Sequence, residues 1–168
     1  MIEKHIETAL NEQINAEFWS AYLYLSMSMH FDNVGHPGIA NWFRIQFQEE
    51  QAHALALADY LNARDGKVEL MPIQEVPTSW DSPLSAFEAT LEHEKNVTKK
   101  INDLYAMAEQ AKDFATRQKL NTFVAEQVEE EESVRQIIDD LTLVGKDGTG
   151  LLQIDRELGA RTFVAPVL

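Results

Sequence analysis

The sequence contains no cysteine. This absence excludes a disulfide framework, a thiolate zinc site, a cysteine-ligated iron–sulfur cluster and a thiol nucleophile, so any metal must be bound through oxygen and nitrogen. Basic residues are also scarce: 14 Lys and Arg stand against 28 Asp and Glu, which gives a formal net charge of −14. Nucleic-acid binding requires a basic surface, so we expect no nucleic-acid partner and regard cations as the more suitable ligands.

Long apolar runs are absent as well. The N-terminal stretch MIEKHIETALNE has no apolar segment typical of a secretory signal. No stretch approaches the ~20 apolar residues that a membrane-spanning helix needs. We therefore expect a cytoplasmic protein without a membrane partner, and the length of 168 residues predicts a single domain over residues 1–168.

Glycine and proline are few, and their positions divide the chain into long helical blocks. Helices are predicted over residues 2–33, 39–64, 84–111 and 114–144, with a short fifth helix over 151–158. Residues 67–83 include Pro72, Pro77 and Pro83, which predicts an extended connection, and the tail from residue 159 is predicted to be irregular. No segment shows the alternation typical of a strand. The sequence therefore predicts an all-α four-helix bundle with a long crossover between the second and third helices.

The apolar stripe of each long helix is interrupted once by polar side chains that can bind metal. The first helix carries Glu17 within its stripe, and the third carries Glu94. The second and fourth helices each carry a pair at i, i+3 spacing, which places both side chains on one face. These pairs are Glu50 with His53 and Gln127 with Glu130.

Counting residues from the turns predicts that these six side chains lie at one level. At ~1.5 Å rise per residue, the groups within each helical hairpin agree to within about 3 Å. Glu50 and Glu94 are also level if the second and third helices are parallel, whereas an antiparallel arrangement would offset them by ~9 Å. The connection over residues 67–83 can extend ~56 Å, which is long enough for a crossover along the bundle.

The charges of this cluster suit two divalent cations. Four glutamates bring four negative charges, whereas neutral His53 and Gln127 bring none. Six hard ligands dominated by carboxylate favour iron or manganese, although zinc would also bind. Six side chains do not saturate two octahedral ions, so open positions would remain for water or dioxygen. The pattern thus favours a reactive dinuclear site over a structural one.

Four segments carry a resemblance to the bacterial non-haem ferritins, within the di-iron carboxylate bundles, and the resemblance extends along nearly the whole chain. They are NEQINAEFWSAYLYLSM, WFRIQFQEEQAHA, SPLSAFEATLEHEK and FVAEQVEEE. The resemblance implies a shell of twenty-four subunits that acts as a ferroxidase, oxidising Fe(II) with dioxygen or peroxide and storing ferric mineral. Bacterioferritin-like proteins place a haem-ligating Met where this chain has Gln51, so haem is not predicted.

The resemblance also implies roles for individual residues. Glu17, Glu50 and His53 would hold the first iron, with Glu50 as a bridge, and Glu94, Gln127 and Glu130 would hold the second. A third iron site would use Glu49, Glu126 and Glu129. Tyr24, one heptad after Glu17, resembles the tyrosine that stands beside the centre in this family, where hydrogen bonding or electron donation would be its role.

Other interpretations remain open. Rubrerythrins need cysteines that this chain lacks, and the larger di-iron oxygenases use Glu-x-x-His twice, whereas the fourth helix has Gln127-x-x-Glu130. A non-catalytic helical assembly whose core acids only bind divalent ions is the alternative function. Tyr24 alone can be read as a core aromatic. The histidines outside the cluster are expected at the surface or in caps: His5, His30, His36 and His93.

Overall fold

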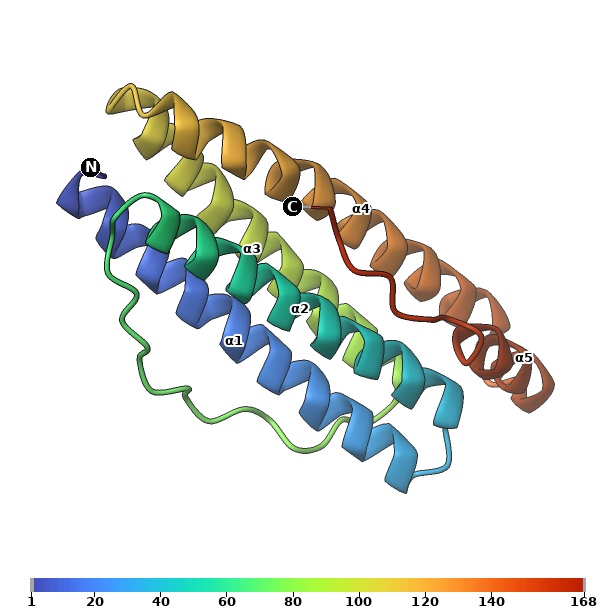
Figure 1. The fold of residues 1–168 in the computed structure, drawn as a ribbon. Coiled ribbons are helices and arrows are strands. Elements are labelled where there is room, and N and C mark those ends of the chain that lie inside the picture. Colours follow the sequence, from blue (N-terminus) through green and yellow to red (C-terminus); the bar gives the residue numbers. More distant parts are fainter. Residues whose placement is uncertain (1, 168) are drawn as a thin grey trace.

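The computed structural model describes residues 2–167, and within this range the chain forms five α-helices and no strand (Figure 1). The predicted all-α architecture is thus confirmed. The helices are α1 (Lys4–Asn33), α2 (Pro37–Ala63), α3 (Pro83–Gln110), α4 (Phe114–Val144) and α5 (Gly148–Leu158). No helix in the described part of the chain is long and apolar enough to cross a membrane.

The four long helices form two hairpins, α1 with α2 and α3 with α4, and the segment between the hairpins has no helix (Figure 1). This segment, residues 64–82, runs along the outside of the bundle from one end to the other. It therefore delivers α3 parallel to α2, as the residue count predicted. Extended backbone suits the segment because its prolines cannot donate the hydrogen bonds of a helix.

Local capping sets the beginnings of the later helices. At α3, the Ser82 hydroxyl accepts from the Ser85 N–H at 3.1 Å while the Ser85 hydroxyl accepts from the Ser82 N–H at 3.0 Å, and Pro83 follows Ser82. At α5, the Asp147 carboxylate accepts from the N–H groups of Thr149 and Gly150. Helix α5 therefore begins at Gly148, three residues before the predicted start at residue 151, because the Asp147 cap lies ahead of the apolar residues of the helix.

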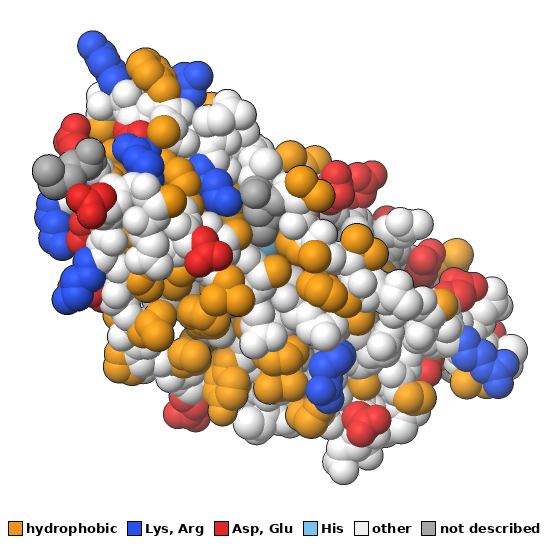
Figure 2. All heavy atoms as spheres, viewed as in Figure 1, with side chains coloured by type: hydrophobic (Ala, Val, Ile, Leu, Met, Phe, Trp, Pro, Cys, Tyr) orange, Lys and Arg blue, Asp and Glu red, His pale blue; other side chains and the backbone are white. Residues whose placement is uncertain are grey.

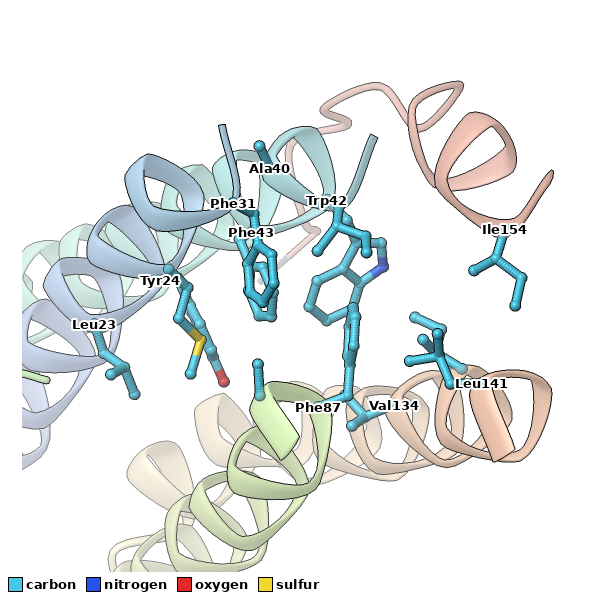
Figure 3. Packing of buried hydrophobic residues seen from close by; sticks show 14 of the residues in the cluster. Leu23, Tyr24, Phe31, Ala40, Trp42, Phe43, Phe87, Val134, Leu141 and Ile154 are labelled. Atoms are coloured by element: carbon cyan, nitrogen blue, oxygen red, sulfur yellow. The ribbon is translucent and has the colours of Figure 1, made fainter. Parts of the chain in front are cut away.

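The apolar core consists of two clusters, one toward each end of the bundle. One cluster is rich in stacked aromatic rings, such as Tyr24 on Phe43 and Phe43 on Phe87 (Figure 3). The other is mainly aliphatic and includes Leu10 and Leu57. On every long helix the predicted metal ligands fall between residues of the two clusters. The polar groups thus form a layer across the middle of the bundle, enclosed by apolar side chains at both ends.

Helical spacing from the predicted ligands also predicts which neighbouring residues face the core, and on α3 this prediction holds for Phe87 and Ile101, which are buried. At three other positions the prediction is displaced by one residue. Thr90, Val97 and Leu104 are buried, whereas the predicted Leu91, Thr98 and Tyr105 are half-buried. Similarly, Tyr60, Leu84 and Val124 of the predicted stripes are only half-buried. Successive side chains of a helix point ~100° apart, so the edge of a wide apolar stripe can be formed by either of two neighbouring residues.

Helix α5 packs closely against the start of α2. The Asp155 carboxylate accepts a hydrogen bond of 2.9 Å from the Ile39 N–H, which would otherwise lack a partner in the first turn of α2. A Cβ atom at Gly38 would lie only 1.5 Å from the Asp155 backbone oxygen, so only glycine permits this approach. Beyond α5, residues 159–167 are irregular, as predicted, and return along the bundle (Figure 1).

Candidate metal centre

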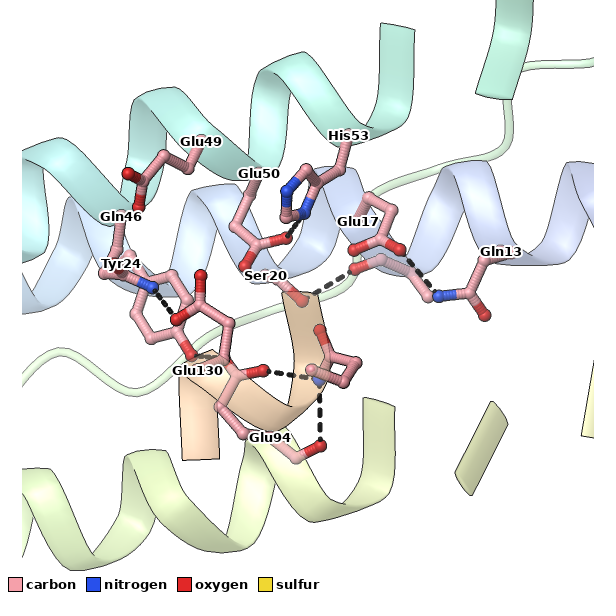
Figure 4. A network of polar contacts seen from close by, with 12 residues as sticks. Gln13, Glu17, Ser20, Tyr24, Gln46, Glu49, Glu50, His53, Glu94 and Glu130 are labelled. Atoms are coloured by element: carbon pink, nitrogen blue, oxygen red, sulfur yellow. Dashed lines mark hydrogen bonds and ion pairs between the residues drawn. The ribbon is translucent and has the colours of Figure 1, made fainter. Parts of the chain in front are cut away.

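All six predicted ligands are buried and meet in the polar layer (Figure 4). They come from the four long helices: Glu17 from α1, Glu50 and His53 from α2, Glu94 from α3, and Gln127 and Glu130 from α4. The layer has two halves, which differ in how the protein satisfies their oxygen atoms. We define the α1–α2 half as Glu17, Glu50 and His53, and the α3–α4 half as Glu94, Gln127 and Glu130.

In the α1–α2 half, ligand atoms converge, and two of the carboxylate oxygens have no hydrogen-bond donor. One ligand atom from each of its three residues lies within 4.8 Å of the others. Gln13 donates to Oε1 of Glu17 at 2.7 Å, and Nδ1 of His53 lies 3.3 Å from Oε2 of Glu50. Oε2 of Glu17 and Oε2 of Glu50 are buried and accept no hydrogen bond. Buried oxygens of this kind are rare in proteins because their desolvation is not compensated.

In the α3–α4 half, protein donors already occupy the carboxylates. The Tyr24 hydroxyl donates to Oε1 of Glu94, and Nε2 of Gln127 donates to Oε2 of the same carboxylate at 3.0 Å. Nε2 of Gln46 donates to Oε2 of Glu130 at 2.9 Å. Gln127 therefore presents its NH₂ group to Glu94 in this arrangement, and its amide would have to turn to offer oxygen to a cation.

Burial raises the pKa of each glutamate in the layer. Desolvation is the main cause for Glu17, Glu50, Glu94 and Glu130, and the pKa of Glu130 reaches about 8. Neighbouring carboxylates add to the effect, since Glu94 raises the pKa of both Glu50 and Glu130. Desolvation also raises the pKa of Tyr24 well above its ordinary value, with Glu94 as the second cause. The layer therefore holds protons that a cation can replace.

These residues fit a divalent cation. The α1–α2 half offers two buried carboxylate oxygens without donors and an imidazole at short range, which is a donor set that iron, manganese and zinc accept. A cation bound there would satisfy the two oxygens and offset the repulsion between the carboxylates. Glu94 and Glu130 of the α3–α4 half would offer further oxygen atoms to a cation only if their hydrogen bonds were given up.

The three residues predicted for an additional iron site are arranged less compactly. Glu49 and Glu126 are half-buried, and Glu129 is exposed. Glu49 forms an ion pair with Arg161 at 2.7 Å. Within residues 2–167, only the α1–α2 half brings ligand atoms of three His, Asp or Glu residues within 4.8 Å of one another. The additional site stays a prediction from the sequence.

Sequence reasoning missed several partners of the ligands. Gln13 stands four residues before Glu17 on the same helical face, a spacing that could have identified it. His93, expected at the surface or in a cap, is half-buried and lies 2.8 Å from the Ser20 hydroxyl. Burial lowers the pKa of His93 to about 4, so the ring is neutral and packs against Trp19 as part of the core edge. No sequence pattern could have identified Arg161 as a partner of Glu49, because the tail has no helical or strand periodicity that would place its side chains.

Comparison with known proteins agrees with this arrangement. Residues 7–144 match the ferritin family, described as the ferritin-like domain. The bacterial non-heme ferritin of Bacteroides fragilis (strain 638R) is 45% identical over 161 residues, which cover 96% of this chain and 100% of that protein. That of Staphylococcus aureus (strain USA300) is 37% identical over 163 residues, covering 97% of this chain and 98% of the relative.

Solved structures show the same similarity. A chain of the open pore ferritin from the hyperthermophilic archaeon Archaeoglobus fulgidus is 51% identical and superposes with a TM-score of 0.96, covering 96% of this chain and 100% of that chain. These similarities agree with the five-helix fold, the parallel crossover and the polar layer of the chain. The chain belongs to the ferritin family.

Proposed function

We propose that the protein is a ferroxidase and iron store that oxidises Fe(II) with dioxygen at a dinuclear centre within each subunit. The observation that supports this proposal best is the pair of buried carboxylate oxygens without donors beside His53. A helical assembly that used its core acids only for packing would gain nothing from leaving these oxygens unpaired. Binding Fe(II) gives them a partner.

In the proposed reaction the ligands act in sequence. Fe(II) first binds Glu17, Glu50 and His53, because this half needs only proton loss to accept a cation. A second Fe(II) binds Glu94, Gln127 and Glu130, with Glu50 as the bridge, and it must displace the donors from Tyr24, Gln127 and Gln46. Each Fe(II) gives one electron, so two ions reduce one dioxygen to peroxide, and the ferric product is hydrolysed to mineral.

The storage function requires a shell, which we propose to contain twenty-four copies of the chain. Its support is the family membership and a face of the subunit with exposed apolar side chains along α1 and the connection after α2 (Figure 2). These side chains are Tyr22, Met29, Leu70, Met71 and Ile73. Contiguous exposed apolar surface of this kind marks a protein interface. The assembly of 19.1 kDa subunits would have a mass of about 460 kDa.

The proposal is tested by light scattering for mass, followed by oxygen uptake after aerobic addition of Fe(II). The variant Glu17→Ala/His53→Ala removes the α1–α2 half, and Glu88→Ala removes an exposed glutamate on α3 as the control. We expect about 460 kDa for all three proteins, with rapid uptake in the parent and control only. Metal binding without rapid oxygen uptake in the parent would favour the non-catalytic assembly instead.

A further inference from the structure

The start of the C-terminal tail is fastened to α2 by one side chain. Nδ2 of Asn41 donates to the backbone oxygens of Leu158, Gly159 and Arg161, at 3.3, 3.5 and 2.9 Å. Figure 1 shows the tail passing from α5 back along the bundle in the region of α2 and α4. Asn41 thus fixes where the Arg161 side chain leaves the tail.

Arg161 lies in a cradle formed by one face of α2. Trp42, Gln46 and Glu49 follow one another at spacings of four and three residues and therefore share a face. The guanidinium lies 4.9 Å from the centre of the Trp42 ring, Nη1 donates to Oε1 of Gln46 at 2.5 Å, and Nη2 donates to Oε2 of Glu49 at 2.7 Å. The Arg161 and Glu49 side chains are only 28% and 17% exposed. Trp42, Gln46 and Glu49 therefore hold the Arg161 guanidinium in one position that is largely shielded from solvent.

This cradle is connected to the metal layer. Gln46 is fully buried, and while its Oε1 accepts from Arg161, its Nε2 donates to Glu130. An amide has one accepting end and one donating end, so the contact with Arg161 fixes the direction of the contact with Glu130. Glu49 directly precedes Glu50 on α2, and Figure 4 shows it on the same helix beside the layer. Arg161 thus contacts one predicted ligand of the third site directly and one ligand of the α3–α4 half through Gln46.

We propose that Arg161 is a tethered cation that competes with a metal ion for Glu49, so that the tail controls when a third cation binds beside the centre. The inference rests on the proposed function. The guanidinium of Arg161 occupies Oε2 of Glu49, the same atom that a divalent cation would bind. Two cations on one carboxylate oxygen repel each other, so Glu49 can hold either the guanidinium or the metal. When a metal takes Glu49, Arg161 leaves and Gln46 loses the donor that fixes its direction, so the Gln46 amide becomes free to turn and release Glu130.

The competition is tested with Zn²⁺, which needs no oxidant, by calorimetric titration of the intact assembly. The variant is Arg161→Gln. Its matched control is Arg156→Gln, which removes the same charge from an exposed position on α5 that forms no ion pair within residues 2–167. We expect two tight ions per subunit in all three proteins. The third ion should bind roughly fivefold more tightly in Arg161→Gln alone, since a partly exposed competitor is worth about 1 kcal/mol.

A second variant separates the tether from the charge. Asn41→Ala keeps Arg161 but frees the tail, and it should strengthen binding of the third ion by a smaller factor. In crystals grown with Zn²⁺, the guanidinium should have left Glu49 wherever the metal contacts it. Equal third-site affinity in Arg161→Gln and Arg156→Gln, no third ion in any variant, or metal and guanidinium together on Glu49 would overturn the inference. Loss of the two tight ions in the parent would contradict the proposed function instead.

Discussion

The two halves of the polar layer differ in how the protein satisfies the carboxylate oxygens with hydrogen bonds. In the α1–α2 half, two carboxylate oxygens lack any donor, whereas in the α3–α4 half Tyr24, Gln127 and Gln46 already donate to the carboxylates. A cation entering the first half replaces protons, but one entering the second half must also replace hydrogen bonds. The difference predicts sequential binding, with the α1–α2 half filled first and the α3–α4 half held more loosely.

Glu50→Ala should produce the largest effect, since it removes the carboxylate proposed to bridge the two halves. We expect the rate of rapid Fe(II) oxidation to fall by about a hundredfold or more. The metal-free assembly should keep or gain thermal stability, because one of several repelling buried acids is gone. Stopped-flow absorbance and calorimetry measure the two quantities. A large fall in the melting temperature of the metal-free protein would show that Glu50 has a structural role, which the control Glu88→Ala would not share.

The raised pKa values predict a pH dependence of metal-free stability. Burial raises the pKa of the four glutamates in the folded state, that of Glu130 to about 8, so the folded chain binds more protons than the unfolded chain between about pH 4.3 and 8. The contribution of these glutamates to the free energy of unfolding is therefore complete below their pKa in the unfolded chain. It is lost as pH rises through their pKa values in the folded protein.

Calorimetric melting across this pH range checks the prediction, with Glu130→Gln as the comparison. The variant should show a weaker decline toward pH 8, since its side chain does not titrate. Zn²⁺ should release protons in weak buffer and remove most of the decline in the parent, because the metal takes the place of the protons. A melting temperature in the metal-free parent that rises steadily up to pH 8 would show that the layer is well solvated.

The sequence predicted the layer better than its surroundings. The six predicted ligands could be proposed because a polar side chain within an apolar stripe is conspicuous, and because the level of each follows from a fixed rise per residue. Helix α5 was predicted too short because its start depends on the single side chain of Asp147. Arg161 could not be predicted, since a guanidinium on an irregular tail reaches its partners only through tertiary packing. Which carboxylates have donors likewise depends on side-chain conformation.

Gln127→His should reduce the difference between the halves by giving the second site an imidazole donor. A neutral amide oxygen donates less to iron than imidazole nitrogen does, so we expect the second Fe(II) to bind roughly tenfold more tightly. Tighter binding should slow the transfer of oxidised iron away from the centre. Repeated small additions of Fe(II) in stopped flow would show the fast phase recovering more slowly than in the parent. Equal recovery and equal second-site affinity would show that Gln127 does not set the turnover.

Tyr24→Phe should produce the smallest effect, because it removes one donor from Glu94 and keeps the aromatic ring stacked on Phe43. The metal-free protein should lose about 1 kcal/mol of stability, the typical value of one intramolecular hydrogen bond. The second cation, which no longer displaces the hydroxyl, should bind slightly more tightly, by a factor of about five. Denaturant unfolding measures the first change and Zn²⁺ titration the second. Weaker second-site binding in the variant would mean that the hydroxyl holds Glu94 in the geometry that the metal requires, so that the donors of the α3–α4 half assist binding instead of opposing it.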